Sequence, residues 1–294
     1  MGTGTAFACS HRGGNRLTKL ADRAFFSQWT PESAYVFGFW FADGSMTQPG
    51  KDYYVSFVSK DLEHLRLIRQ VMQAEQKIYV RPDGCYTLAI GSKQTWYDLL
   101  RLGGTPAKSL VAAMPYVPQT LMRHFIRGYV DGDGSLYWDT TQRRTPRINI
   151  VGGLSFLEKL AQVIHQDTDV GIAKIRTHKS KTPYLAYTGI KAQVLAKWLY
   201  IPGELMLERK GMLAQEFGTW ELSKFGWKSQ AVMTDRMREI LEWWQRGGFY
   251  HHHRKGQITD VGKKYCRVLQ RADGYGYSQP CTPTGAFLSS LSRD

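Results

Sequence analysis

Two aspartates, Asp43 and Asp133, occupy the same place in two similar stretches of sequence, GFWFADGS and GYVDGDGS. Each aspartate directly precedes a Gly-Ser pair at the end of a mainly apolar run with helical spacing. A helix C-terminus carries partial negative charge, so a carboxylate there is unfavourable unless a cation lies nearby. Two such carboxylates, with neighbouring backbone carbonyls, offer the hard oxygen ligands that Mg²⁺ prefers. The pair therefore predicts a divalent metal site.

Small residues in the two stretches predict how the aspartates meet. Gly38 and Ala42 are four residues apart and share one helical face, and Gly128 and Gly132 do the same. Small residues at this spacing let two helix backbones approach closely. We therefore expect a helix interface built on these four residues, with the two aspartates at neighbouring helix ends.

The residues next to each aspartate are alike on one side and different on the other. Gly44 and Gly134 follow the aspartates, and we expect each glycine to end its helix in a left-handed turn. Two positions before the aspartate, the first stretch has Phe41 and the second has Asp131. Because only the final aspartate is shared, we assign the chemistry to that position and interpret Asp131 as structural or solvated.

The elements that follow each stretch also repeat. Strand patterns lead into an amphipathic helix, for which Asp61 and Ser155 are the expected N-caps, and two short strands and a second helix come next. The order predicts an α+β fold of two pseudo-symmetric αββαββα repeats, at residues 25–105 and 119–217. A proline-containing linker, residues 106–118, joins them.

The two ends of the chain differ from the repeats. Residues 1–24 lack periodicity and predict a flexible N-terminal arm. Residues 225–294 contain one helix pattern at 233–248 and another that opens at Thr259. We expect a small, mostly helical C-terminal appendage there, which is either winged-helix-like or a helical extension packed on the second repeat.

Composition limits the class of protein. The chain has 294 residues, 43% of them hydrophobic, and a formal net charge of +14, which favours a polyanionic partner, most often nucleic acid. Its four cysteines include no Cys-x-x-Cys pair, which disfavours a zinc ribbon, and the size and aromatic content of the chain disfavour a disulfide framework. The sequence shows neither a membrane-length apolar run nor a signal core. We expect an intracellular protein without a membrane partner, in the cytoplasm of a prokaryote or phage-infected cell or in an organelle.

The two motifs, with the order of elements around them, resemble the LAGLIDADG motifs of single-chain homing endonucleases. The resemblance covers residues 25–217. It implies that the motif helices form the interface between two halves, and that saddle-shaped antiparallel sheets lie in the DNA major groove. It also implies hydrolytic cleavage of both strands across the minor groove, leaving short 3′ overhangs.

The same resemblance implies metal ligands. The last acidic residue of each motif binds a divalent cation, Mg²⁺ or another such as Mn²⁺, and the preceding backbone carbonyl helps. By position these ligands are Asp43 with Ala42, and Asp133 with Gly132.

Basic and polar residues outside the motifs complete the expected site. Lys93 and Lys191 follow the fourth strand of their repeats, and we predict that each offsets negative charge on a phosphate in the active site. Base readout needs side chains that project from strands into the major groove, and we expect about half of the candidates to contact DNA. The candidates are Lys51, Tyr53, Arg81, Arg144, Arg147, Arg176, Lys179, Lys181 and Tyr184.

These features predict a site-specific double-stranded DNA endonuclease that acts as a monomer on a long target, since both motifs lie on one chain. One alternative is a splicing maturase that binds intron RNA, and another is a DNA-binding regulator that does not cleave. The presence of both carboxylates favours the nuclease. The absence of a recognisable splicing block around the nuclease predicts a free-standing or intron-encoded protein rather than an intein.

Overall fold

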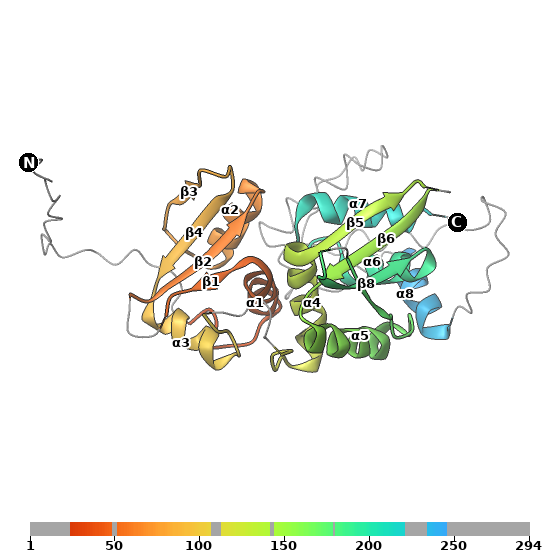
Figure 1. The fold of residues 1–294 in the computed structure, drawn as a ribbon, viewed down its shortest axis with the longest axis horizontal. Helices are drawn as coiled ribbons and strands as arrows, with labels where there is room; N and C mark the ends of the chain where they lie inside the picture. Colours follow the sequence, from red (N-terminus) through yellow and green to blue (C-terminus); the bar gives the residue numbers. More distant parts are fainter. Residues whose placement is uncertain are drawn as a thin grey trace, which may run out of the picture.

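The computed structural model describes residues 24–48, 52–106, 113–141, 144–178, 180–220 and 234–245. Two αββαββα repeats lie beside each other, as Figure 1 shows. The first comprises α1 (Pro31–Asp43), β1 (Ser45–Met46), β2 (Tyr54–Ser59), α2 (Leu62–Val71), β3 (Ile78–Val80), β4 (Tyr86–Gly91) and α3 (Lys93–Arg101). The second comprises α4 (Gln119–Asp133), β5 (Gly134–Asp139), β6 (Thr145–Val151), α5 (Leu154–Thr168), β7 (Ile175–Thr177), β8 (Pro183–Thr188) and α6 (Ile190–Leu199). Helices α7 (Glu208–Gly218) and α8 (Asp235–Gln245) follow, and the predicted α+β class is confirmed.

Each repeat contains a four-stranded antiparallel sheet with the same topology. The strand orders are β1-β2-β4-β3 and β5-β6-β8-β7. Ser56 of β2 lies between Ser45 and Ala89, and Asn149 of β6 lies in the same way between Ser135 and Ala186. The two sheets can therefore be compared position by position.

Alternation along the strands gives each sheet a buried and an open face. Helices α2 and α3 contact the first sheet, and α5 and α6 contact the second. Residues of β2, β4, β6 and β8 that face these helices are fully buried, as in Val55, Phe57, Leu88, Ile90, Ile148, Ile150, Leu185 and Tyr187. Residues between them point to the opposite face, where they stay partly exposed.

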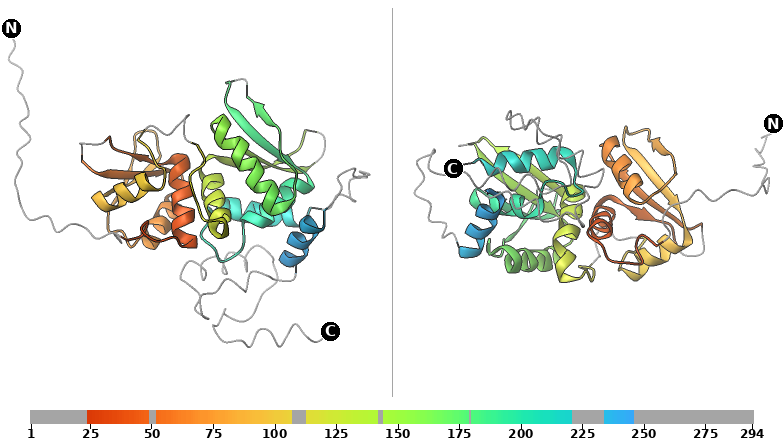
Figure 2. Two further views of the ribbon diagram at one scale, coloured as in Figure 1. Left: turned by 90° about the horizontal axis from the view of Figure 1, so that it is seen from below. Right: turned by 180° about the vertical axis from the view of Figure 1, so that it is seen from behind.

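The motif helices α1 and α4 lie side by side between the two sheets (Figures 1 and 2). A Cβ atom on Gly38 would lie 2.0 Å from the carbonyl oxygen of Phe125, and one on Gly128 would lie 2.0 Å from that of Tyr35. Nearer the C-terminal ends, a Cβ on Gly132 would lie 2.4 Å from the Cβ of Ala42. The two backbones thus approach closer than any larger side chain allows.

Aromatic side chains fill the space around this helix pair. Phe41 lies 5.8 Å, ring centre to ring centre, from Phe125 of α4 and 5.7 Å from Phe156 of α5. Phe37 lies 5.5 Å from Phe125. The aromatic residue that replaces an acidic one in the first motif is thus a core residue, 5% exposed.

Two local sequence predictions are wrong. Gly44 and Gly134 have φ angles of −87° and −97°, so neither helix ends in a left-handed turn. Glycine is required there by close packing, because a Cβ would lie 2.1 Å from the Trp40 ring or 2.4 Å from the carbonyl oxygen of Val130. Helix α5 begins at Leu154 with Gly153 as its N-cap, so the cap precedes the expected position at Ser155.

Several predicted segments fall largely outside the described residues. They include the N-terminal arm up to residue 23, residues 107–112 of the linker and most of the appendage, with the helix expected after Thr259. Within the appendage, α8 contacts α5 and α6, and its Met237 and Ile240 are buried. Among the described helices, none combines the length and apolarity that a membrane span needs.

We predict that Gly128→Ala destabilises the protein by about 3 kcal/mol, because the added methyl group overlaps the Tyr35 carbonyl and the helices must separate. Gly84→Ala is the control. Gly84 lies in the β3–β4 hairpin with φ +79° and nothing within 4 Å, so the change costs only backbone strain of about 1 kcal/mol. Urea unfolding measures both, and equal losses would argue against the close helix approach.

Candidate active site at the ends of the motif helices

Helices α1 and α4 end at the two motif aspartates, and β1 and β5 begin one or two residues later. The carboxylate of Asp43 lies beside α4, since a Cβ on Gly132 would be 3.3 Å from its Oδ2 atom. Asp43 is exposed and Asp133 is half-buried. The paired helix ends therefore hold two carboxylates from different repeats at a solvent-accessible position.

The pKa of Tyr129, one turn before Asp133, is affected by the negative charge of both aspartates. Its pKa lies far above the usual range, chiefly because the ring is buried. The negative charge of Asp133, and then that of Asp43, raises this pKa further. The phenol keeps its proton and donates it to the carbonyl oxygen of Val151 at 2.9 Å. Both carboxylates thus act on the same small region.

A buried lysine of α7, Lys210, lies under this region. Its Nζ atom donates to the carbonyl oxygens of Val130 at 2.6 Å, Asp131 at 2.8 Å and Gly134 at 2.7 Å. An ammonium group has three protons, and all three are used. Lys210 therefore neutralises the negative end of α4 immediately beside Asp133.

The negative charges of both motif carboxylates influence the Lys210 amine. Burial lowers the pKa of Lys210 to about 8, whereas Asp131, and after it Asp43 and Asp133, raise this pKa. The sequence contains a signal for this residue that the search for repeated motifs missed. Lys210 shares the helical spacing of the buried residues Leu207, Ala214 and Phe217, which marks it as a cation on an apolar face.

The structure does not bring the two lysines chosen from sequence to the carboxylates. The Lys93 amine lies 5.5 Å from the Tyr53 ring centre, and the Lys191 amine lies 3.2 Å from where a Cβ of Gly171 would be. In the second sheet, Gly134, which follows Asp133, pairs with Ile150, and Ile150 pairs with Leu185 of β8. Strand β8 continues from Leu185 for three residues, about 10 Å, before it ends at Thr188 and α6 begins. Lys210 takes the place beside the site.

Asp131 is structural. It is fully buried and accepts hydrogen bonds from the hydroxyls of Tyr35 at 2.6 Å and Tyr200 at 2.8 Å, and from the backbone N–H of Leu207 at 2.7 Å. Burial raises the pKa of Asp131, against the effect of Lys210 and of these donors. One carboxylate thus joins α1, α4 and the segment between α6 and α7.

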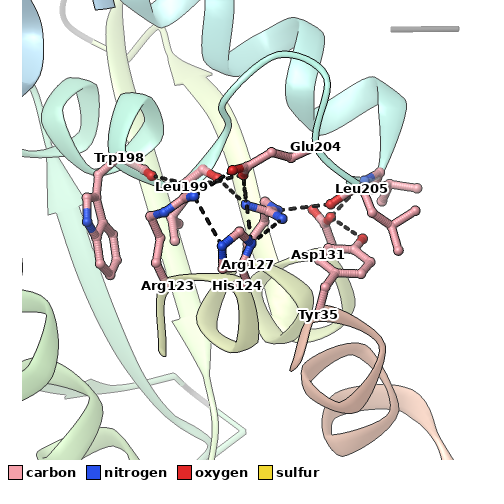
Figure 3. A network of polar contacts seen from close by, with 10 residues as sticks. Tyr35, Arg123, His124, Arg127, Asp131, Trp198, Leu199, Glu204 and Leu205 are labelled. Atoms are coloured by element: carbon pink, nitrogen blue, oxygen red, sulfur yellow. Dashed lines mark hydrogen bonds and ion pairs between the residues drawn. The ribbon is translucent and has the colours of Figure 1, made fainter. Parts of the chain in front are cut away.

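Figure 3 shows that a second buried carboxylate, Glu204, holds the same segment. Arg123 donates to it at 2.5 and 2.7 Å, and Arg127 forms an ion pair with it. Burial would raise the pKa of Glu204, but Arg127 and Arg123 outweigh burial and hold the pKa well below its usual range. Glu204 is therefore ionised and fixes the segment to α4.

Arg127 extends this network. It donates to the carbonyl oxygens of Leu205 at 2.9 Å and Leu199 at 3.1 Å, and to Nδ1 of His124 at 3.0 Å. Its guanidinium also lies 5.3 Å from the ring centre of Tyr35 in α1. The segment from Leu199 to Leu207, which leads directly into α7 and Lys210, is thus tied to α4 at several points.

The predicted DNA-reading residues fall into two groups. Arg147, Arg176 and Tyr184 lie on the open face of the second sheet, where Arg176 is directly opposite Tyr184. Arg147 is ion-paired with Asp139 at 2.7 Å, and the Tyr184 ring stacks on His178 at 4.0 Å. These three residues thus share one face of the second sheet.

The other candidates lie elsewhere. Tyr53 precedes β2 and packs against Trp96 and Tyr97, so its neighbour Tyr54 occupies the open face instead. Arg144 stacks on Trp138 at 4.3 Å and pairs with Glu216 at 3.5 Å. Two candidates are in hairpin loops, namely Arg81, which pairs with Asp83, and Lys181. Two more, Lys51 and Lys179, lie outside the described residues.

Comparison with known proteins adds the following. No family model and no curated protein matches the chain. Solved structures that match are dominated by LAGLIDADG proteins. The LAGLIDADG meganuclease I-AabMI bound to uncleaved DNA is 12% identical, with 73% of this chain and 98% of that chain covered and a TM-score of 0.45. A mutant of I-SmaMI is 13% identical, with 84% and 100% covered and a TM-score of 0.44. Full-length DUF199/WhiA from Thermatoga maritima is 14% identical, with 78% and 71% covered and a TM-score of 0.43.

The family that the two sequence motifs resemble is thus found again among the matching folds. Identities of 12 to 14% and TM-scores below 0.5 describe a distant likeness of fold.

We predict that Lys210→Met lowers the free energy of unfolding by about 2 kcal/mol, because three backbone carbonyls lose their buried donor. Arg209→Met is the matched control. Its guanidinium is mostly exposed and pairs only with Asp61 in the contacts described, so the loss stays below about 1 kcal/mol. Chemical denaturation of both variants gives the comparison, and a Lys210 variant as stable as the control would contradict the assigned role.

We predict that Glu204→Gln costs about 3–5 kcal/mol at neutral pH, since it leaves two buried guanidinium groups without their counter-charge. A lowered pKa contributes stability that is present above about pH 5 and is lost as the pH falls further. The variant should therefore show a shallower loss of stability than the wild type between about pH 5 and pH 3. Denaturant titrations at several pH values test this, with Glu216→Gln, at an exposed pair, expected to follow the wild-type profile.

Proposed function

We propose that this chain is a LAGLIDADG-type endonuclease that hydrolyses both strands of a specific double-stranded DNA site with a divalent cation. The observation that carries the proposal is the meeting of Asp43 and Asp133, one from each repeat, at adjacent helix ends beside a buried ammonium group. Two carboxylates from two pseudo-symmetric halves suit a reaction that is performed once on each strand.

The donor set fits a hard divalent cation that binds together with DNA. Asp43 and Asp133 offer carboxylate oxygens, and Ala42 and Gly132 are the residues whose carbonyls precede them. Within the described part of the chain, no group of three or more His, Cys, Asp or Glu side chains forms a complete metal cage. Mg²⁺ commonly binds one or two carboxylates and takes its other ligands from phosphate and water. When bound, such a cation supplies positive charge that offsets the charge developing on the phosphate.

Residues of this chain prepare the site for that chemistry. Lys210 holds the last carbonyls of α4, which fixes the direction in which Gly132 and Asp133 are presented. Its charge also reduces the repulsion between the two carboxylates and an incoming phosphate. The protonated hydroxyl group of Tyr129 lies beside Asp133 on the buried side of the site. Asp43 and Asp133 remain open to solvent on the other side.

The rest of the chain supports DNA as the substrate. Its formal net charge of +14 favours a polyanion, and two open sheet faces provide surfaces for base contacts. Since both aspartates belong to one chain, a monomer supplies both cleavage centres. Mg²⁺ or Mn²⁺ as the ion, and an intron or other mobile element as the genetic context, are parts of the same proposal.

The decisive experiment is cleavage of a randomised double-stranded DNA library with Mg²⁺, with EDTA as a control. Cuts at one long sequence that disappear in EDTA support the endonuclease. Specific binding without cutting identifies a DNA-binding regulator instead. Binding of intron RNA without DNA binding identifies a maturase.

We predict that Asp43→Asn and Asp133→Asn each abolish double-strand cleavage and leave DNA binding within about threefold, because each removes one carboxylate without changing the fold. Cleavage and binding are measured on the selected target. Asp235→Asn, at a fully exposed carboxylate of α8, is the control and should cut normally. Full double-strand cleavage by either motif variant would refute the site.

A further inference from the structure

The open faces of the two sheets carry different chemistry at equivalent positions. The register makes Tyr54 equivalent to Arg147, Ser56 to Asn149, and Tyr79 to Arg176, with Thr87 matching Tyr184. The alanines Ala89 and Ala186 also correspond. Among the strand residues of this face, the first sheet has hydroxyl, aromatic and apolar side chains without a charge or an amide. The second sheet has two arginines, an asparagine, and an aspartate, Asp139, that is paired with Arg147.

We propose that the second repeat supplies most of the base-specific hydrogen bonds to the DNA target, and that Asn149 reads an adenine at the centre of this surface. This inference rests on the proposed function. It goes further by assigning unequal roles to the two halves of the target and a specific base to one residue.

Asn149 is the residue whose surroundings favour a ligand most directly. Its Nδ2 atom donates to the hydroxyl of Tyr137 at 3.1 Å, while its Oδ1 atom is buried and has no hydrogen-bond partner among the described residues. Buried acceptors without a partner are uncommon in folded proteins. An asparagine amide pairs with adenine by accepting from N6 and donating to N7, and Asn149 has both an unused acceptor and a second N–H for this.

The residues beside Asn149 on the adjacent strands are small. Ser135 and Ala186 flank it on these strands. Larger side chains stand further out, namely Tyr137, Arg147 and Tyr184. The amide therefore lies low on the sheet between larger residues, and these side chains must turn aside for a base edge to reach its buried Oδ1 atom.

The arginines of the same face add directional donors. The guanidinium of Arg147 forms an ion pair with Asp139 at 2.7 Å, and the Arg147 side chain is one-third exposed. Arg176 is exposed on the edge strand β7. Arginine side chains commonly pair with guanine in the major groove. The first sheet presents Tyr54 and Tyr79 at these two positions, which favour apolar contact over paired hydrogen bonds.

The expected consequence is a DNA target whose two halves contribute unequally to sequence specificity. A correct paired contact discriminates against the wrong base by about tenfold to a hundredfold. Base changes in the half bound by the second repeat should therefore weaken binding much more than changes in the other half.

The test uses the full chain and a target selected for binding from a randomised DNA library, with Ca²⁺ in place of Mg²⁺ so that binding is measured without cutting. The Kd is then measured for every single base-pair change. We expect losses of tenfold or more to cluster in one half of the target. Asn149→Ala should remove the preference for adenine at one position in that half, whereas Ser56→Ala should change no preference by more than about twofold.

A second variant separates readout from folding. Asn149→Asp keeps the size of the side chain but leaves only acceptors, so the preferred base at that position should change from adenine towards cytosine. A structural role would weaken binding to all sequences equally. That uniform result, an even spread of losses over both halves, or a Ser56→Ala effect as large as that of Asn149→Ala, would overturn the inference.

The outcome is also distinct from that of the proposed function. Lopsided, Asn149-dependent binding without cleavage in Mg²⁺ would support this inference and remove the endonuclease. Cleavage in Mg²⁺ of a target whose two halves contribute equally to binding would support the endonuclease and overturn this inference. A chain without sequence-specific DNA binding would overturn both.

Discussion

Close contact between the backbones of α1 and α4 is the constraint on which the molecule depends. Gly38 lies against the Phe125 carbonyl and Gly128 lies against the Tyr35 carbonyl, so the contact is reciprocal. Any side chain at either glycine would push the helices apart. Because both helices end at an aspartate, the same approach that packs the core also brings the two carboxylates together. Packing and chemistry are thus set by one geometric requirement.

Charge compensation solves the problem that this approach creates. Two helix ends and two carboxylates concentrate negative charge in a small volume. The buried ammonium group of Lys210 offsets this charge by donating to carbonyl oxygens at the end of α4. The segment that leads into Lys210 is held against α4 through Glu204, Arg127 and Asp131 (Figure 3). In the described part of the chain this support comes from the second repeat. The two motif ends are therefore similar in position but different in electrostatic surroundings.

Local patterns in the sequence predicted the repeats, their order of elements and the helix interface, because helical and strand periodicities are short-range properties. Three placements depend instead on distant contacts or on strand register. Helical spacing marks Lys210 as buried, but its partners at the end of α4 and the start of β5 are 76 to 80 residues away in sequence, so no local pattern places it beside the aspartates. The sequence predicts Tyr53 at the DNA-facing surface, whereas the strand places Tyr54 on the open face, because a one-residue shift moves a side chain to the other face of a sheet. The roles of Lys93 and Lys191 remain predictions. The pairing register places the ends of β4 and β8, which these lysines follow, beyond the level at which β1 and β5 begin.

The aromatic core around α1 and α4 has a thermodynamic consequence for the whole molecule. Phe37 and Phe41 come from one repeat and Phe125 and Phe156 from the other, yet they pack as one cluster. Neither half keeps a closed core if its neighbour unfolds. The two repeats should consequently behave as a single cooperative unit, so that strain introduced in one sheet lowers the population in which the other sheet is native. The two halves of such a protein can differ in their exposed surfaces and still unfold together in one transition.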